Sequence, residues 1–156
     1  MPLPTKQFLR NLAGLEDSPH KIALGLALGI FIGFLPIMGI QMAAVLPFAI
    51  LFRGNKTAAI GGVWISNPLT FIPIYYMNYQ VGLLFSSYHR MTWEHFTELF
   101  EKLDLSSLIQ LGKEILIPLI LGSFIVAIVS AVPTYFVTRL LVSRYHKRQA
   151  RLTASK

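Results

Sequence analysis

Residues 22–52 read IALGLALGIFIGFLPIMGIQMAAVLPFAILF, a run of 31 residues without a charged side chain. One membrane-spanning helix needs only about 20 apolar residues, so this run is too long for one ordinary span. Pro36 and Gly39 interrupt it and leave two parts, 22–35 and 37–52. As helices these parts would be about 21 and 24 Å long, shorter than a hydrocarbon core of about 30 Å. We therefore expect a re-entrant hairpin of two short helices.

The whole chain shares this apolar character. Of its 156 residues, 54% are hydrophobic and only 13% are charged, whereas soluble domains carry about 25% charged residues. The sequence therefore predicts an integral membrane protein. It contains no cysteine, which excludes disulfides, thiol catalysis and cysteine metal sites.

Two further runs lack charge, residues 57–88 and 115–138. Asn67-Pro68 interrupts the first of them and leaves 69–88 as a part long enough to span. The second run has 24 residues, which would be about 36 Å long as a helix. We expect two transmembrane helices here, beside the broken hairpin.

Charge on the connecting segments predicts the topology. Residues 89–114 carry three basic and five acidic side chains, a net charge of −2, whereas residues 139–156 carry six basic and no acidic ones. The connector 53–56 adds two basic residues. Because basic loops stay on the cytoplasmic side, we expect both termini there. This pattern accounts for the net charge of +7, so we do not expect nucleic-acid binding.

The expected fold is all-α, a re-entrant or broken helical hairpin plus two transmembrane helices and interfacial amphipathic helices. We expect a single membrane domain with five consecutive parts: an N-terminal interfacial segment (1–17), a broken-helix core (18–88), an extracytoplasmic amphipathic loop (89–114), a transmembrane helix (115–138) and a basic cytoplasmic tail (139–156).

A glycine repeat marks the first part of the hairpin. Gly25, Gly29 and Gly33 recur every four residues and so lie on one face of a helix. Small residues at this spacing let another helix backbone approach closely. We assign these three glycines to helix packing.

The two breaks are the candidate substrate-binding region. Broken helices in transporters place free backbone groups and polar side chains at mid-depth in the membrane. Gln41 either satisfies the broken turn or lines a polar path, and the two breaks either form a site or merely pack together. The basic connector either draws anionic headgroups or only sets topology. The candidate residues are Pro36, Gly39, Gln41, Arg53, Asn55, Asn67, Pro68 and Thr70.

No catalytic or metal-binding pattern appears in the sequence. The four histidines form no pair three or four residues apart, and every Asp and Glu lies outside the charge-free runs. No phosphate-binding glycine loop or nucleophile elbow is present. An interfacial enzyme using Glu94, His95 or Glu98 lacks a converging acid, base and nucleophile. We expect no enzyme activity, no metal and no cofactor.

Residues 18–84 contain a characteristic series of short motifs: Ser18-Pro19, Ile22-Ala23-Leu24-Gly25, Gly29-Ile30-Phe31-Ile32-Gly33, Pro36-Ile37-Met38-Gly39-Ile40-Gln41, Arg53-Gly54-Asn55-Lys56 and Trp64-Ile65-Ser66-Asn67-Pro68-Leu69-Thr70, followed by Pro73 and Tyr76. This series resembles the uncharacterised bacterial membrane family called domain of unknown function 2062. The resemblance implies a small multi-pass protein of the bacterial inner membrane, and it names no activity or substrate.

Two functions fit these features. The first is a small membrane transporter, or a lipid scramblase or flippase, that moves an anionic lipid or small solute through a cleft between the breaks. Such a small chain would need to form a homo-oligomer to enclose a path, with anionic membrane lipids as its partners. The alternative is a non-catalytic membrane partner or assembly factor that binds another protein or anionic lipid.

Overall fold

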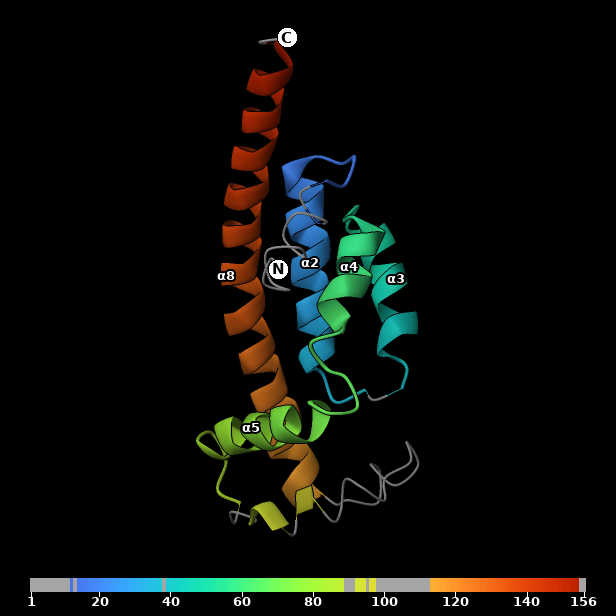
Figure 1. The fold of residues 1–156 in the computed structure, drawn as a ribbon. Helices are drawn as coiled ribbons and strands as arrows, with labels where there is room; N and C mark the ends of the chain where they lie inside the picture. The colour runs from blue at the N-terminus through green and yellow to red at the C-terminus, as the bar shows by residue number, and fades with distance from the viewer. Residues whose placement is uncertain are drawn as a thin grey trace.

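The structure is a computed structural model, and it describes residues 12, 14–37, 39–88, 92–94, 96–97 and 113–154. Within these residues it contains helices and no strand (Figure 1). The N-terminal interfacial segment and the amphipathic loop of the sequence analysis lie largely outside the described residues. The helices are α2 (Pro19–Phe34), α3 (Gln41–Leu51), α4 (Lys56–Val63), α5 (Phe71–Leu83) and α8 (Lys113–Ala154).

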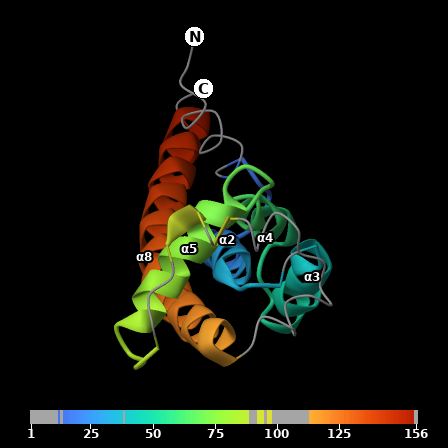
Figure 2. The same cartoon turned by 90° about the horizontal axis from the view of Figure 1, so that it is seen from below.

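Helix α2 lies at the centre of the arrangement. It packs against α8 on one side and against α3 and α4 on the other. Helices α2, α3 and α4 run up and down beside one another, and α8 runs antiparallel to α2 (Figure 1). Helix α5 lies across the lower part of α8, which is seen most clearly from below (Figure 2).

Local sequence explains where α2 begins and ends. Ser18 accepts a hydrogen bond from the Lys21 amide at 3.3 Å, and Pro19 occupies the first helical position. The helix ends at Phe34 because the residue before a proline avoids helical backbone, and Leu35 is extended with ψ 143°. The expected broken hairpin is present, with α3 starting after the turn.

The second expected break is present, but the helix after it is shorter than predicted. The prediction of one span over residues 69–88 is wrong, because α5 has 13 residues and is about 20 Å long. Helix α8 instead has 42 residues and continues through the segment predicted as a separate tail. Among the described helices, one is long and apolar enough to cross a membrane, over Lys113–Thr153. By length and composition, this helix indicates membrane association.

Glycines permit two close helix contacts. A Cβ atom at Gly29 would overlap the Ala59 carbonyl of α4, and one at Gly62 would lie 2.6 Å from the Leu26 carbonyl of α2. The repeat assigned to helix packing, Gly25, Gly29 and Gly33, faces α4 and the segments flanking it. Where α5 crosses α8, Cβ atoms at Gly82 and Gly122 would overlap backbone carbonyls of the opposite helix.

Two polar contacts fix the level of α2 along α8. His20, near the start of α2, shares a 2.8 Å hydrogen bond with Tyr135 of α8. At the other end, the Asn78 amide bridges the Phe34 carbonyl and the Ser123 hydroxyl. Helix α2 therefore ends level with Ser123, about 15 Å short of the first residue of α8.

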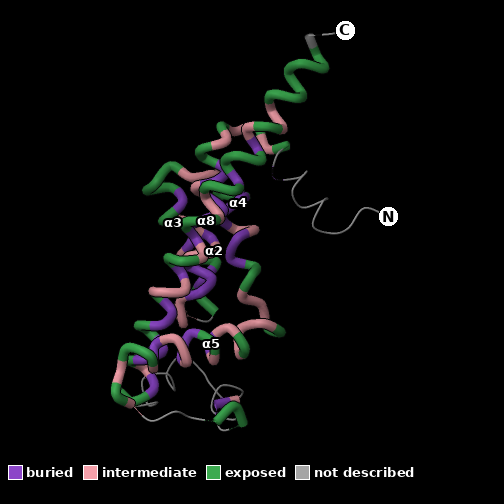
Figure 3. Tube along the Cα trace, turned by 90° about the vertical axis from the view of Figure 1, so that its left-hand side faces the viewer, coloured by how far each residue is buried: buried purple, intermediate pink, exposed green. Residues whose placement is uncertain are grey.

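Many residues on the outer faces of the helices are exposed (Figure 3), and they include residues with large apolar side chains. Buried residues concentrate between α2, α3 and α4, where Ile32, Val45 and Val63 pack together. The outward faces of α3 and α8 are uncovered instead. Their exposed side chains include Phe48, Leu51, Phe52, Phe124, Ile128, Val129, Val132, Phe136 and Val137.

Replacing Gly29 by leucine should destabilise the fold by about 1–3 kcal/mol, because its side chain would force α4 away from α2. The measurement is thermal unfolding of the purified protein by circular dichroism. Ala43→Leu is the matched control, since Ala43 is exposed on α3. An equal fall in Tm for both variants would contradict the close α2–α4 contact.

Candidate functional site

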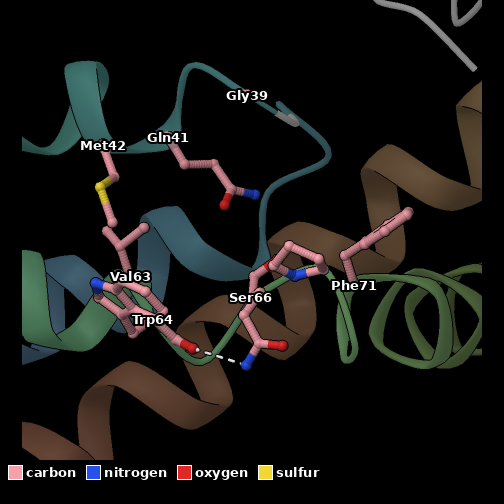
Figure 4. Close-up of a pocket in the computed structure, with 9 residues that line it drawn as sticks. Gly39, Gln41, Met42, Val63, Trp64, Ser66 and Phe71 are labelled. Atoms are coloured by element: carbon pink, nitrogen blue, oxygen red, sulfur yellow. Dashed lines mark hydrogen bonds between the residues drawn. The ribbon is translucent and has the colours of Figure 1, made fainter.

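The two helix breaks meet at one cavity of about 410 Å³. Gln41 and Met42 come from the start of α3, whereas Val63 and Trp64 come from the end of α4 (Figure 4). The walls are largely apolar, with two amide side chains and one hydroxyl among them. The lining residues are Gly39, Gln41, Met42, Val63, Trp64, Ser66, Asn67, Pro68 and Phe71.

Gln41 both lines the cavity and closes the first break. Its side chain is 7% exposed, and Nε2 donates to the Leu35 carbonyl at 3.2 Å and to the Tyr75 hydroxyl at 3.1 Å. The Tyr75 hydroxyl donates to the same Leu35 carbonyl at 3.2 Å. Buried carbonyl groups without a donor are costly, so Gln41 and Tyr75 stabilise the broken turn.

Asn78 of α5 satisfies the preceding carbonyl group. Its fully buried side chain donates from Nδ2 to the Phe34 carbonyl at 2.9 Å and to the Ser123 hydroxyl at 3.0 Å. One amide therefore joins the end of α2 to both α5 and α8.

The second break is held by hydrogen bonds within the segment itself. The Asn67 Oδ1 atom accepts from the Leu69 amide at 2.9 Å, and its Nδ2 donates to the Trp64 carbonyl at 3.3 Å, as drawn in Figure 4. Thr70 Oγ1 accepts from the Asn67 amide at 3.0 Å and donates to the Ile65 carbonyl at 2.7 Å. Asn67 and Thr70 thus make a compact turn from the end of α4 to the start of α5.

The structure brings only part of the predicted set together. Gly39, with φ 84°, and Gln41 share the cavity with Asn67 and Pro68, while Pro36 and Thr70 belong to the two turns without lining it. The positive φ of Gly39 is a backbone conformation that glycine adopts without strain and that other residues rarely adopt.

Arg53 and Asn55 lie at the opposite end of the hairpin, away from the cavity (Figure 1). Helix α3 separates them from the break, since its 11 residues extend about 16 Å. Arg53 is exposed, and Asn55 caps α4 by accepting from the Ala58 amide at 2.8 Å. Of the candidate substrate-binding residues, Arg53 and Asn55 therefore do not line the cavity at the breaks.

Asn55 also connects α4 to the start of α2. Its Nδ2 atom donates to the Asp17 carboxylate at 2.8 Å, and Lys21 forms an ion pair with Asp17 at 3.3 Å. The hydrogen bond from Asn55, together with contacts from Lys21, lowers the pKa of Asp17 below its usual value of 3.8. These contacts hold the start of α4 against the start of α2 at this end of the hairpin.

Sequence reasoning missed Asn78 as a site residue. The spacing was visible in the sequence, because Tyr75, Asn78, Tyr79 and Gly82 follow at intervals of three, one and three residues, and the structure shows all four to be buried. Such spacing marks one face of a helix that packs against protein. An amide on that face needs a buried partner.

The cavity is chemically suited to binding. Its lining side chains include no acid, base or activated nucleophile. In the part of the chain that the structure describes, no three His, Cys, Asp or Glu residues gather as a metal site. The available interactions are apolar contact and amide hydrogen bonds.

Replacing Asn78 by leucine should destabilise the protein by about 1–3 kcal/mol, because the Phe34 carbonyl loses its side-chain donor. Thermal unfolding of the purified variant measures this loss. Ser123→Ala removes only the bond to Ser123 and should cost less. Similar small losses in both variants would show that the Phe34 carbonyl does not depend on Asn78.

Asn55→Ser should lower stability at neutral pH and less so in acid. Serine can still cap α4 but lacks the amide that donates to Asp17. Because the folded-state pKa of Asp17 is lowered, this stabilisation is present above about pH 4 and lost as pH falls through that folded-state pKa. The test compares unfolding temperatures of wild type and variant at neutral and acidic pH. If the difference in unfolding temperature between wild type and variant did not change with pH, the proposed stabilisation by the Asn55–Asp17 hydrogen bond would be contradicted.

Comparison with known proteins identifies a bacterial family. No curated protein and no solved structure matches the chain. A family model described as "Uncharacterized protein conserved in bacteria" matches residues 4–151, nearly the full length. The series of motifs around the two breaks is thus part of a chain-wide match. The chain belongs to the bacterial family DUF2062.

Proposed function

We propose that this chain is a multi-pass protein of the bacterial inner membrane that moves an anionic lipid through the cleft between its two helix breaks. The convergence of both breaks on one largely apolar cavity carries the proposal. No enzymatic step is involved.

The distribution of charge supports a membrane setting. At one end of the described structure lie mostly basic side chains: Lys21, Arg53, Lys56, Arg139, Arg144, Lys147, Arg148 and Arg151, with Glu16 and Asp17. At the other end lie Glu94, Lys113 and Glu114. The helices between carry exposed apolar side chains, as a lipid-facing surface requires. The basic end would face the cytoplasm, with both termini on that side.

Helix levels support a hairpin that enters and returns. If α8 crosses between Lys113 and Arg139, α2 begins at the Arg139 side and ends level with Ser123. The break then lies about 24 Å below Arg139, within the hydrocarbon region. Helix α4 and the second break, rather than α5, would carry the chain to the far side.

This placement satisfies the strictest requirement of a bilayer. Irregular backbone is tolerated at depth only where protein or water covers it and its polar groups are paired. The first break has Gln41, Tyr75 and Asn78 as donors to its carbonyl groups, and the second has Asn67 and Thr70. Gln41 therefore has a structural role as well as lining the cleft. Its hydrogen bond to the Leu35 carbonyl helps to make a helix break possible at this depth.

The cleft favours lipid over a small polar solute. Met42, Val63, Trp64 and Phe71 give it apolar walls suited to acyl chains. Helix α3 begins at this wall without a side-chain cap, and a helix N-terminus attracts negative charge. An anionic lipid presents both chemistries. A second copy of the chain against the exposed faces of α3 and α8 would complete the path as a homo-oligomer.

The alternative is a membrane assembly factor that binds a partner without moving lipid. One observation favours it: Gln41, Asn67 and Thr70 already make hydrogen bonds to the backbone. In that case the exposed face of α3, with Phe48, would bind the partner.

Met42→Trp tests the transport proposal by narrowing the cleft without removing a hydrogen-bonding side chain. Met42 is 45% exposed and lines the cleft, whereas Met77 on α5 is 43% exposed and does not, so Met77→Trp is the matched control. Liposomes containing a fluorescent phosphatidylglycerol would report its movement between leaflets. We expect wild type and Met77→Trp to move the lipid, and Met42→Trp to lose about tenfold in rate, equivalent to about 1.4 kcal/mol.

Two outcomes would overturn this function. Protein-dependent movement that is equal in both variants would exclude the cleft as the path. No movement by the folded wild-type protein would favour the assembly factor, and proteins that copurify with the intact chain would then identify the partner.

A further inference from the structure

A second cavity lies on the face of α2 that contacts α8, away from both breaks. It is an apolar groove of about 220 Å³. The side chains from α2 recur at helical spacing, and those from α8 continue the opposite wall. Its lining residues are Leu24, Ala27, Leu28, Phe31, Ala131, Val132, Tyr135 and Phe136. At the end of the groove nearer the first break, the ring of Phe31 contacts that of Phe124, with 6.1 Å between the ring centroids.

A polar cluster stands at the other end of the groove. The Tyr135 hydroxyl, on a residue that lines the groove, lies 2.8 Å from His20 Nδ1 and accepts from Arg139 Nη1 at 3.3 Å. His20 is one helical turn before Leu24, and Arg139 is one turn after Tyr135. The cluster therefore continues directly from the apolar walls.

After these hydrogen bonds are made, N–H donors of Arg139 remain available to an anion. The Tyr135 hydroxyl oxygen accepts from Arg139, and the same hydroxyl shares a second hydrogen bond with His20 Nδ1, whose direction depends on the His20 tautomer. The second ring nitrogen of His20, Nε2, takes no part in this bond. A guanidinium group has five N–H donors, of which Tyr135 takes one. Among the described residues, no carboxylate forms an ion pair with Arg139. His20 and Arg139 are both exposed.

We propose that this groove and cluster bind one anionic phospholipid, with its phosphate at Arg139 and His20 and an acyl chain along the groove. Arg139 is the first charged residue after the charge-free run 115–138, which is the level of phosphate groups in a bilayer. The site combines a cation at the headgroup level with apolar walls below it. A free phosphate ion would match only the first of these features, and a neutral apolar helix only the second.

This inference rests on the proposed membrane setting but not on the cleft between the breaks. The groove shares no lining residue with that cleft. The bound lipid would hold α2 against α8 at the cytoplasmic surface, or be the molecule delivered toward the cleft. Failure of one site does not entail failure of the other, because Met42→Trp should leave this binding intact.

Native mass spectrometry of the detergent-purified protein tests the site. Dioleoylphosphatidylglycerol and dioleoylphosphatidylcholine would be titrated separately. We expect wild type to prefer the anionic lipid and Arg139→Gln to lose that preference by about tenfold, as expected for one charge-assisted contact. Arg148→Gln, which removes the same charge further along α8, should retain it. Equal loss in both variants would reduce the effect to general attraction by the basic helix.

The groove is tested separately from the cation. Val132→Trp fills it, whereas Val129→Trp places the same bulk on an exposed part of α8 outside it. Only Val132→Trp should weaken binding of both lipids. Binding unaffected by Val132→Trp, or displacement of the lipid by an equal concentration of glycerol phosphate, would overturn a lipid site. Loss of a dimer in Val132→Trp would instead assign the groove to a second copy of the chain.

Discussion

The carbonyl groups of Phe34 and Leu35, where α2 ends, need hydrogen-bond donors from elsewhere in the chain. The Leu35 carbonyl accepts from the nearby Ile37 amide at 2.8 Å and also from Gln41 and Tyr75. The donor to Phe34 is Asn78, which arrives from α5. Helix α5 must therefore lie across the end of α2, and Asn78 binds Ser123 of α8 from the same position. The transverse helix, the short hairpin and the level of α8 all follow from completing this one helix end.

Local signals predicted the breaks well. Proline removes a backbone donor and restricts the residue before it, so Pro36 and Asn67-Pro68 identify the ends of α2 and α4 within a few residues. Glycine at intervals of four likewise predicts a close helix contact, whereas the single glycines Gly82 and Gly122 give no such pattern. The α5–α8 crossing could not be read from the sequence for that reason.

The errors came from using the length of apolar runs as the length of helices. Residues 84–88 are uncharged, yet α5 ends at Leu83, because absence of charge does not require helical backbone. The sequence did not place Arg53 and Asn55 relative to the two breaks. They lie between the two breaks in sequence, but a hairpin sends its connector to the opposite end. The helix length of α3 already implied this separation.

The contact between α2 and α8 affects the order in which the chain folds. Helix α2 is the first described helix to leave the ribosome and α8 is the last, yet they share an extensive contact. Contacts between distant parts of a chain form late, because closing a long loop costs entropy before any contact forms. One side of α2 therefore stays uncovered until α8 has been synthesised. Completion of the core therefore requires α8, and a chain truncated before α8 would expose that surface to quality control.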